Sequence, residues 1–381
     1  MDLPRVETRF YDLPEPLPLK TGGVLPGVRL AYEQYGELNA DKSNAILLFH
    51  ALTGSQHAYG YNPEVPGTGD LWREENHVGW WNAQIGPGRS LDTEKFCIIC
   101  VNLIGSCYGS TGPTSLNPST GVPWAGFFPR VTATDQSHAQ ALLLDHLGID
   151  RLHAVVAPSI GGLVGLTFLT LYPQRVARFV SIGSGYRNSM RNKLMVFEQI
   201  LCIENDAKFN NGFYSPDDPP VNGLALARII SHKLFVCWDA LERRARREVG
   251  PGGDMLSWYE PQESSESYML HQGTKFAKRF DANSYLRIAD LWAHYNAAAE
   301  AGYERMEDLL EDLRPYDIKW MVFAIDSDLC FLPQEQVEFV TLLVGAGMDC
   351  ELVTVHSEKG HDSFLLEPEL YDPSLMPFLN E

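Results

Sequence analysis

The sequence is poor in positive charge. Its 381 residues include 30 Lys and Arg against 49 Asp and Glu, which gives a formal net charge of −19. Sequence-independent binding to DNA or RNA needs clustered Lys and Arg, so we expect no nucleic-acid partner. A run of ~18 apolar residues, long enough to span a bilayer, is also missing, and we expect no membrane span. The opening stretch MDLPRVETRFYDL is polar and lacks the apolar core of a secretory signal. We therefore expect a cytoplasmic protein.

The cysteines are few and form no recognisable framework. There are seven, an odd number, and their spacing is irregular. Cys97 and Cys100 make a C-x-x-C, but both lie inside the apolar run FCIICVNL, and no second pair is near them. We interpret them as reduced, buried residues. The histidines are scattered without the spacing of a metal site, so we expect no metal.

A perfect G-x-S-x-G motif is also absent, although HAVVAPSIGGL at 153–163 comes close. An apolar run ends at Pro158, and a new apolar, periodic segment begins at Leu163. This pattern predicts a strand, a sharp turn and a helix, with Ser159 at the apex. A serine so placed is pushed out of the turn and lies over the N-terminus of the next helix, as a nucleophile requires. Only Ala157, in place of glycine, departs from the motif.

Continuous apolar runs recur along the chain, and they are typical of strands that are covered on both faces of a parallel sheet. From about residue 183 to 304 these runs give way to helical periodicity. We therefore predict an α/β fold with a mostly parallel central sheet. Residues 1–183 and 305–381 would form its core, and residues 184–304 an inserted helical lid. The predicted strands are residues 11–17, 28–35, 44–49, 96–102, 154–157, 177–182, 320–325 and 350–355; the predicted helices are residues 132–147, 190–204, 224–248, 268–279, 284–296 and 334–345.

Two further polar residues are expected at the same edge of the sheet as Ser159. Asp328 and His361 each follow a predicted strand, and ligands of open α/β sheets bind at the carboxyl ends of the strands. The order Ser, Asp, His is that of α/β-hydrolase triads. In such a triad the histidine takes the serine proton, and the aspartate orients the imidazole and stabilises its cation. No metal ion is needed for this chemistry.

Neighbouring residues compete for two of these roles. Asp326 lies two residues before Asp328, which we favour because it lies farther past the strand end. His356 ends its strand too early, whereas Gly360 gives the loop around His361 freedom to present a ring.

An oxyanion hole would be formed by two backbone N–H groups. One is Ile160, the residue after the candidate nucleophile. The other is Leu52, in the HALTG turn that follows an early strand. His50 of the same turn is interpreted as structural.

Several strings together resemble the homoserine O-acyltransferases, the α/β-hydrolase-fold family that includes homoserine O-acetyltransferase. Their joint occurrence, from about residue 25 to 370, is what makes the resemblance specific. The strings are HALTG at 50–54, GWWNAQIGPG at 79–88, NLIGSCYGSTGP at 102–113, GLALAR at 223–228, KFAKRFDANSY at 275–285, DSDLCF at 326–331 and GHDSFL at 360–365.

The resemblance implies an acyl transfer of methionine biosynthesis in two ping-pong steps. Ser159 would take the acyl group from acyl-CoA, preferably acetyl-CoA, and His361 would activate the hydroxyl of homoserine. Arg228 would bind the carboxylate of homoserine and Asp362 its amino group. A homodimer through the lid helices and no tightly bound cofactor are also implied. Without the resemblance, we would interpret Arg228 as a salt-bridge residue on a lid helix and Asp362 as a helix N-cap.

The sequence departs from the family pattern at Ala157, at Phe235, where a tyrosine is frequent, and at Asn296, where an aspartate is common. These departures could change the donor or the acceptor, so an O-succinyltransferase and a serine O-acyltransferase stay open as alternatives. A plain esterase, in which water is the acceptor, is an alternative of another class. A degenerate homologue without activity is disfavoured because Ser159, Asp328 and His361 are all present. The cations at 187, 191 and 193 are either partners for CoA phosphates or a solvated helix face.

Overall fold

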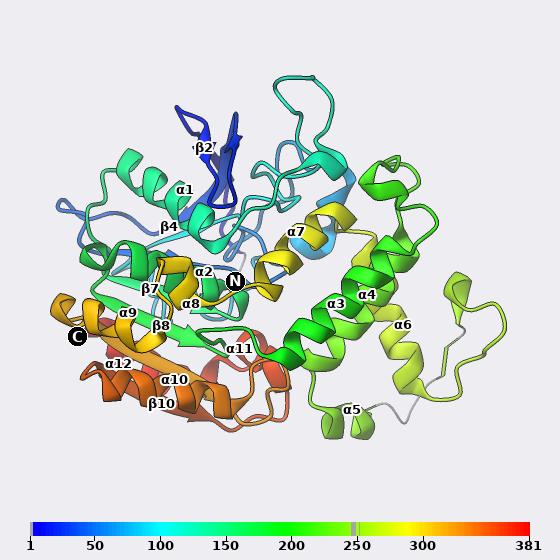
Figure 1. Cartoon of the computed structure of the whole chain (residues 1–381). Coiled ribbons are helices and arrows are strands. Elements are labelled where there is room, and N and C mark those ends of the chain that lie inside the picture. Colours follow the sequence, from blue (N-terminus) through cyan, green and yellow to red (C-terminus); the bar gives the residue numbers. More distant parts are fainter. Residues whose placement is uncertain (1–2, 245–248, 251) are drawn as a thin grey trace.

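The structure is a computed structural model that describes residues 3–244, 249–250 and 252–381, built around an eight-stranded sheet (Figure 1). The strand order is β1-β4-β6-β5-β7-β8-β9-β10. The pairs from β6 to β10 are parallel, and β1 and β4 pair antiparallel at one edge. The predicted mostly parallel sheet is confirmed. The strands are β1 Arg9–Asp12, β4 Arg29–Tyr35, β5 Ala45–Leu48, β6 Cys97–Val101, β7 Ala154–Pro158, β8 Arg178–Ile182, β9 Lys319–Ile325 and β10 Asp349–Val355.

Both faces of the sheet are buried along its central strands β5, β6 and β7, as their continuous apolar sequences require. In β5, Leu47 packs into one apolar cluster, while Ile46 and Leu48 pack into a second cluster on the opposite face. Cys97 and Cys100 of β6 are divided between the two clusters in the same way, so the C-x-x-C does not form one site. The first cluster includes residues of α1 (Ala133–His146), α2 (Ile160–Leu171) and α10 (Pro333–Gly345), and the second includes residues of α11 (Ser363–Leu366) and α12 (Asp372–Asn380).

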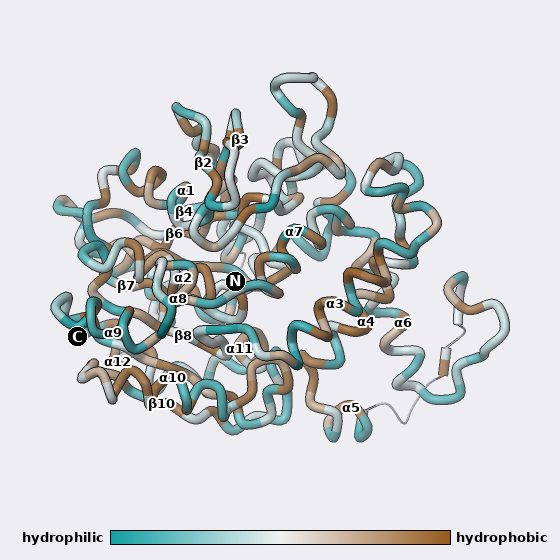
Figure 2. Tube along the Cα trace, viewed as in Figure 1, coloured by the Kyte–Doolittle hydropathy of each residue, from teal (hydrophilic) through white to brown (hydrophobic). Residues whose placement is uncertain are grey.

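Helices fill most of the chain between β8 and β9. α3, α4 and α6 lie to one side of the sheet, whereas α8 packs against α1 and α2, and α9 against α10 (Figure 1). α3 packs against α4 and α7, and α4 also packs against α6. Figure 2 shows apolar stretches along α3 and α4. No helix in the described ranges is long and apolar enough to cross a membrane. The helices are α3 Met190–Glu204, α4 Val221–Phe235, α5 Trp238–Arg244, α6 Ser264–Ala277, α7 Ala282–Ala293, α8 Ala297–Ala301 and α9 Met306–Leu313.

The single helix predicted over 224–248 is wrong. α4 ends at Phe235, the backbone is extended at Val236 (φ −107°, ψ 146°), and α5 begins at Trp238. The break has a packing reason, since Gly360 lies directly against this backbone: a Cβ on Gly360 would be 2.8 Å from the Phe235 carbonyl oxygen and 2.7 Å from the Cys237 nitrogen. Residues 245–248 of the predicted helix lie outside the described residues.

The strand predicted over 11–17 is also wrong in its extent. Pairing with β4 stops at Asp12. Pro14 and Pro16 follow, and a proline cannot donate a ladder hydrogen bond. The next strand, β2 (Leu17–Pro18), belongs instead to a small hairpin with β3 (Val24–Leu25).

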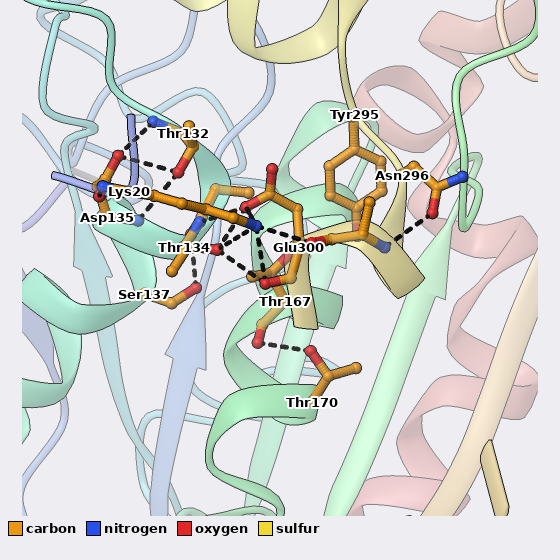
Figure 3. A network of polar contacts seen from close by, with 12 residues as sticks. Lys20, Thr132, Thr134, Asp135, Ser137, Thr167, Thr170, Tyr295, Asn296 and Glu300 are labelled. Carbon is orange, nitrogen blue, oxygen red and sulfur yellow. Dashed lines mark hydrogen bonds and ion pairs between the residues drawn. The ribbon is translucent and has the colours of Figure 1, made fainter. Parts of the chain in front are cut away.

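A polar network fastens α8 to the N-terminus of α1 (Figure 3). The Lys20 ammonium donates to the Glu300 carbonyl oxygen at 2.9 Å and lies 3.2 Å from the Glu300 carboxylate. The Thr134 N–H donates to the same carboxylate at 3.0 Å. Asn296 caps α8, because its side-chain oxygen accepts from the Ala299 N–H at 3.1 Å. The end of the helical region is thereby fixed to the core, and Asn296 has a local structural role.

Candidate active site

Ser159 lies in a strained turn between β7 and α2. Its φ of 56° and ψ of −135° are unusual for a residue with a side chain, and such a conformation costs on the order of 1–3 kcal/mol. The turn closes only because two glycines follow. A Cβ on Gly161 would lie 2.8 Å from the His50 carbonyl oxygen, and one on Gly162 would lie 2.3 Å from the Ser184 hydroxyl. The predicted strand, turn and helix are confirmed.

Ala157, the departure from the motif, is accommodated by a glycine on α2. A Cβ on Gly165 would lie 2.8 Å from the Ala157 Cβ. The methyl group of Ala157 therefore occupies the space that Gly165 leaves empty. The elbow tolerates alanine because the helix behind it carries no side chain at the facing position.

Ser159, His361 and Asp328 form one chain of hydrogen bonds. The His361 Nε2 atom is 2.8 Å from the Ser159 Oγ atom, and His361 Nδ1 is 2.7 Å from Asp328 Oδ2. The other Asp328 oxygen accepts from the backbone N–H groups of Cys330 and Phe331, at 2.6 and 2.9 Å. With the Nδ1–H donating to the carboxylate, Nε2 accepts from the serine hydroxyl. The sequence placed these three side chains at one edge, and the structure brings them together.

The surroundings of His361 make it a stronger base. Burial disfavours the imidazolium, but the charge and hydrogen bond of Asp328 and the charge of Asp362 together outweigh burial. The pKa of His361 is therefore raised above its usual 6.5. A base with a raised pKa takes a proton from serine more readily.

The competing residues Asp326 and His356 pair with each other. His356 Nδ1 lies 2.9 Å from Asp326 Oδ2, and both side chains are exposed. Asp326 also accepts from the Ser357 N–H at 3.1 Å. Asp326 and His356 thus form a separate pair that makes no hydrogen bond to Ser159, so they do not take the roles predicted for Asp328 and His361.

The two N–H groups predicted for an oxyanion hole belong to Ile160 and Leu52. Ile160 is the first residue of α2, and a helix leaves its first N–H groups without an intrahelical acceptor. Leu52 lies in a turn closed by a 3.0 Å hydrogen bond from the Gly54 N–H to the Ala51 carbonyl. Its own N–H donates to no acceptor within the described ranges. Leu52 also lines the cavity in front of Ser159.

His50, which precedes this turn, uses both ring nitrogens on the backbone. Its Nδ1 lies 2.8 Å from the Ala51 carbonyl oxygen, and its Nε2 accepts from the Leu103 N–H at 3.1 Å. Burial lowers the pKa of His50 to about 4. The neutral ring links the two loops, in agreement with a structural role.

Arg228 and Asp362 face the same cavity of about 180 Å³ as Ser159 and His361. In the described part of the chain, no ion pair joins Arg228 to a carboxylate; its guanidinium lies over the rings of Phe235 and Phe276, 5.3 and 5.0 Å from their centroids. Burial lowers its pKa, the charge of Arg279 adds to this, and Asp362 opposes it.

Among the residues that the structure describes, Asp362 likewise has no hydrogen-bond or ion-pair partner for its carboxylate. It stands at the N-cap of α11, but its side chain makes no capping hydrogen bond. Burial raises the pKa of this carboxyl, while the charges of His361 and Arg228 lower it. The cavity thus offers the cations of Arg228 and Arg279 and the carboxylate of Asp362, and Arg228 and Asp362 together complement an amino-acid zwitterion.

Sequence reasoning missed part of the cavity wall. Trp80 and Arg279 line it, and Phe235 packs against His361 with ring centroids 5.7 Å apart. Trp80 belongs to the string GWWNAQIGPG at 79–88. Arg279 stands inside the string KFAKRFDANSY, but nothing in its spacing indicated a position near Ser159. Two of the three cations considered for CoA are engaged elsewhere: Arg187 pairs with Glu338 and Arg191 donates to the Cys330 carbonyl.

The described residues contain no group of three or more His, Cys, Asp or Glu side chains that could hold a metal ion. The arrangement around Ser159 instead suits nucleophilic attack on an acyl group by a serine with a histidine base.

Comparisons with known proteins agree with the fold. The profile of the alpha/beta hydrolase fold family matches residues 44–368. The solved homoserine O-acetyltransferase of Bacillus anthracis is 27% identical, with a TM-score of 0.87 over 100% of this chain and 99% of that one. The solved esterase E22 is also 27% identical, with a TM-score of 0.86 over 98% of this chain and 100% of its own.

Curated relatives match over nearly the whole chain. A homoserine O-acetyltransferase of Geobacter metallireducens is 39% identical over 96% of this chain and 94% of its own length. A homoserine O-succinyltransferase of Alkalilimnicola ehrlichii is 36% identical over 98% of this chain and 94% of its own. The chain therefore belongs to the homoserine O-acyltransferase family, within the alpha/beta hydrolase fold.

Proposed function

We propose that the protein transfers an acyl group, preferably acetyl, from an acyl-CoA to the side-chain hydroxyl of homoserine. The observation that carries the proposal is the hydrogen-bonded chain of Ser159, His361 and Asp328. It shares one cavity with Arg228 and Asp362, which form no ion pair with any residue in the described ranges. A serine nucleophile explains the acyl group, and the opposite charges explain an amino-acid acceptor.

In the first half-reaction, the Ser159 oxygen attacks the thioester carbonyl while its proton passes to His361 Nε2. The N–H groups of Leu52 and Ile160 face the oxyanion that develops, each contributing a few kcal/mol. Collapse of the tetrahedral intermediate breaks the carbon–sulfur bond, and the thiolate takes the proton from His361. Free CoA leaves, and an acyl-serine remains.

In the second half-reaction, His361 removes the proton of the homoserine hydroxyl, and the hydroxyl oxygen attacks the acyl-serine. The bond to Ser159 breaks, and the serine oxygen regains the proton from His361. Arg228 pairs with the acceptor carboxylate in a directional, charge-assisted contact. Asp362 accepts from the acceptor ammonium. Holding both charged ends fixes the hydroxyl in reach of the base.

Ester hydrolysis is the second candidate, favoured by the likeness to the solved esterase E22. Water would then replace the acceptor, and Arg228 and Asp362 would have no part in turnover. O-Succinyl transfer and a serine acceptor are the nearest alternatives within the transferase class.

One experiment separates these functions. Purified protein is given acetyl-CoA or succinyl-CoA with homoserine, serine or no acceptor, and the free CoA thiol is followed. We expect release that depends on homoserine and is faster with acetyl-CoA. Release that is equal with and without an amino acid would contradict transfer. Ser159→Ala should abolish turnover, and a variant with full activity would remove Ser159 as the nucleophile.

A homodimer through the lid helices is part of the proposal. Four apolar residues at helical spacing, Met190, Leu194, Phe197 and Leu201, are 40–68% exposed on α3. A contiguous apolar stripe of this kind marks an interaction surface, and a second copy is its simplest occupant. Phe197→Asp should yield monomers in light scattering, and an unchanged mass would exclude this surface. The cytoplasmic location and the division into core and lid at residues 184–304 stay predictions.

A further inference from the structure

A second cavity, of about 250 Å³, adjoins the one in front of Ser159. The two share Thr53, Gly54, Trp80, Arg228 and Arg279. We call it the outer cavity. It extends from the shared residues toward α6 and toward the short 3₁₀ helix Glu74–Asn76, and Glu75 and Lys275 are part of its wall.

The outer cavity is positively charged in a chain that is strongly negative. Its wall carries Arg228, Lys275 and Arg279 against the single carboxylate of Glu75, while the whole chain has a net charge of −19. That carboxylate is shared: one oxygen lies 3.3 Å from the Lys275 ammonium, and the other lies 3.3 Å from the Arg279 Nε atom. The single carboxylate of Glu75 therefore neutralises only part of the charge of Lys275 and Arg279, and the wall of the outer cavity keeps a net positive charge.

The cations are placed to meet a ligand. The Lys275 side chain is 49% exposed, and its partner Glu75 is 28% exposed, so an incoming anion can compete with Glu75. Arg279 is more fixed, because it also donates to the Tyr108 hydroxyl at 2.9 Å and lies over the Phe276 ring. Arg279 lines both cavities, so a group bound to it lies next to the acyl position.

We propose that the outer cavity binds an anionic group of the acyl donor, with Lys275 and Arg279 as its cations and Glu75 as the anion that it displaces. The inference rests on the proposed acyl transfer. Two donor groups have this chemistry. The phosphates of CoA are one, and the distal carboxylate of a dicarboxylic acyl chain is the other. The latter is only three bonds, roughly 4 Å, from the acyl carbonyl carbon.

A purely structural role for the contacts of Glu75 predicts a different effect of substitutions at Glu75 and Lys275. The loop is already tied to the end of α6, because the Arg73 Nε–H donates to the Lys278 carbonyl at 2.8 Å. If Glu75 and Lys275 only strengthened this tie, losing either would impair the enzyme in the same direction. If Glu75 occupies the place of a ligand anion, losing it frees the cations and tightens donor binding. The two substitutions then act in opposite directions.

The test uses four donors and three variants of the full-length protein, with homoserine saturating. The donors are acetyl-CoA, succinyl-CoA and the acetyl and succinyl thioesters of N-acetylcysteamine, which carry no phosphate. The variants are Lys275→Ala, Glu75→Gln and, as a matched control, Lys278→Ala, an exposed lysine at the same helix end that does not line the cavity. Initial rates give KM and kcat for each donor.

We expect Lys275→Ala to raise the KM of an anionic donor about three- to tenfold, the loss of one partly exposed, charge-assisted contact. Glu75→Gln should lower the same KM, and Lys278→Ala should leave it unchanged. An effect confined to the two CoA donors identifies the phosphates as the bound group, and one confined to the two succinyl donors identifies the distal carboxylate. Effects that are equal for the acetyl thioester without phosphate, or absent for all donors, would overturn the inference. Turnover of no donor would instead reject the proposed transfer itself.

Discussion

Substituting Gly165 by alanine places a methyl group on the face of α2 that packs behind the nucleophile elbow. The added Cβ would lie 2.8 Å from the Ala157 Cβ and 3.2 Å from side-chain carbons of Phe49 and Val155. Contacts this short force neighbouring atoms to move, which costs about 1–3 kcal/mol in a packed core. The higher helix propensity of alanine returns only about 1 kcal/mol. We therefore expect Gly165→Ala to lower the free energy of unfolding by up to about 2 kcal/mol.

The substitution Ala157→Gly, alone and combined with Gly165→Ala, tests the same contact from the other side. Ala157→Gly alone removes one buried methyl group, about 0.8 kcal/mol, and adds backbone freedom worth about 0.5–1 kcal/mol. If the two sites were independent, the double variant would lose about 3 kcal/mol. In the double variant, however, the methyl group introduced by Gly165→Ala fills the space that Ala157→Gly vacates. We expect the double variant to be nearly as stable as the natural protein.

Urea unfolding followed by tryptophan fluorescence gives the free energies of all four proteins. The coupling between the two sites should be about 2–3 kcal/mol, which is within the range for residues in direct contact. Additive losses, with the double variant about 3 kcal/mol below the natural protein, would refute the complementarity of Ala157 and Gly165. An unchanged slope with urea concentration shows that the differences are differences in stability.

Three other predictions concern charged and titratable groups. Arg228→Ala should raise the KM for homoserine about 10- to 100-fold, the loss of a charge-assisted contact, and leave single-turnover acylation by acetyl-CoA unchanged; an unchanged KM removes its role. His361 must be neutral to act as a base, so activity should fall as the pH drops through its raised pKa. Asp362→Asn removes a negative charge that raises this pKa. The acid side of the pH–rate profile, measured for acylation of the enzyme without an acceptor, should therefore move to lower pH, and a move to higher pH would contradict the prediction. The pKa of His50 is about 4 in the folded protein and 6.5 in the unfolded chain, so the neutral ring's contribution to the free energy of unfolding is complete above pH 6.5 and is lost as the pH falls toward 4. The loss is at most about 3 kcal/mol. In urea unfolding at pH 7 and 4.5, His50→Gln should reduce the difference in stability between the two pH values.

The sheet and the Ser159 site could be predicted because their signals are local. A strand covered on both faces must be apolar throughout, so β5, β7 and β9 stand out as short continuous runs. The carboxyl end of each strand then fixes where the next polar residue lies. Asp328 was preferred to Asp326 for its distance past the strand end, and the structure gives the reason: Asp326 turns outward to His356.

Other features depend on contacts between distant segments, which no local pattern records. The end of α4 at Phe235 follows from the packing of Gly360, more than a hundred residues later in the chain. The position of Arg279 near Ser159 follows from where the end of α6 lies, since Lys275 and Phe276 of that helix line the outer cavity. The pairing of Glu75 with Lys275 joins a loop and a helix that are 200 residues apart in sequence. Periodicity describes one element at a time, so these pairings need the assembled fold.

The close contact between Gly360 and the end of α4 bears on how family members can be recombined. Arg228 lies on α4, and the last residue of that helix packs against His361. The loop that carries the candidate base is therefore shaped by the same helix that carries the candidate acceptor-binding arginine. A chimera that exchanges only residues 184–304 between two relatives would separate two surfaces that fit each other. Such an exchange should include residues 356–362, so that α4 and the loop that carries His361 come from the same relative and their surfaces fit.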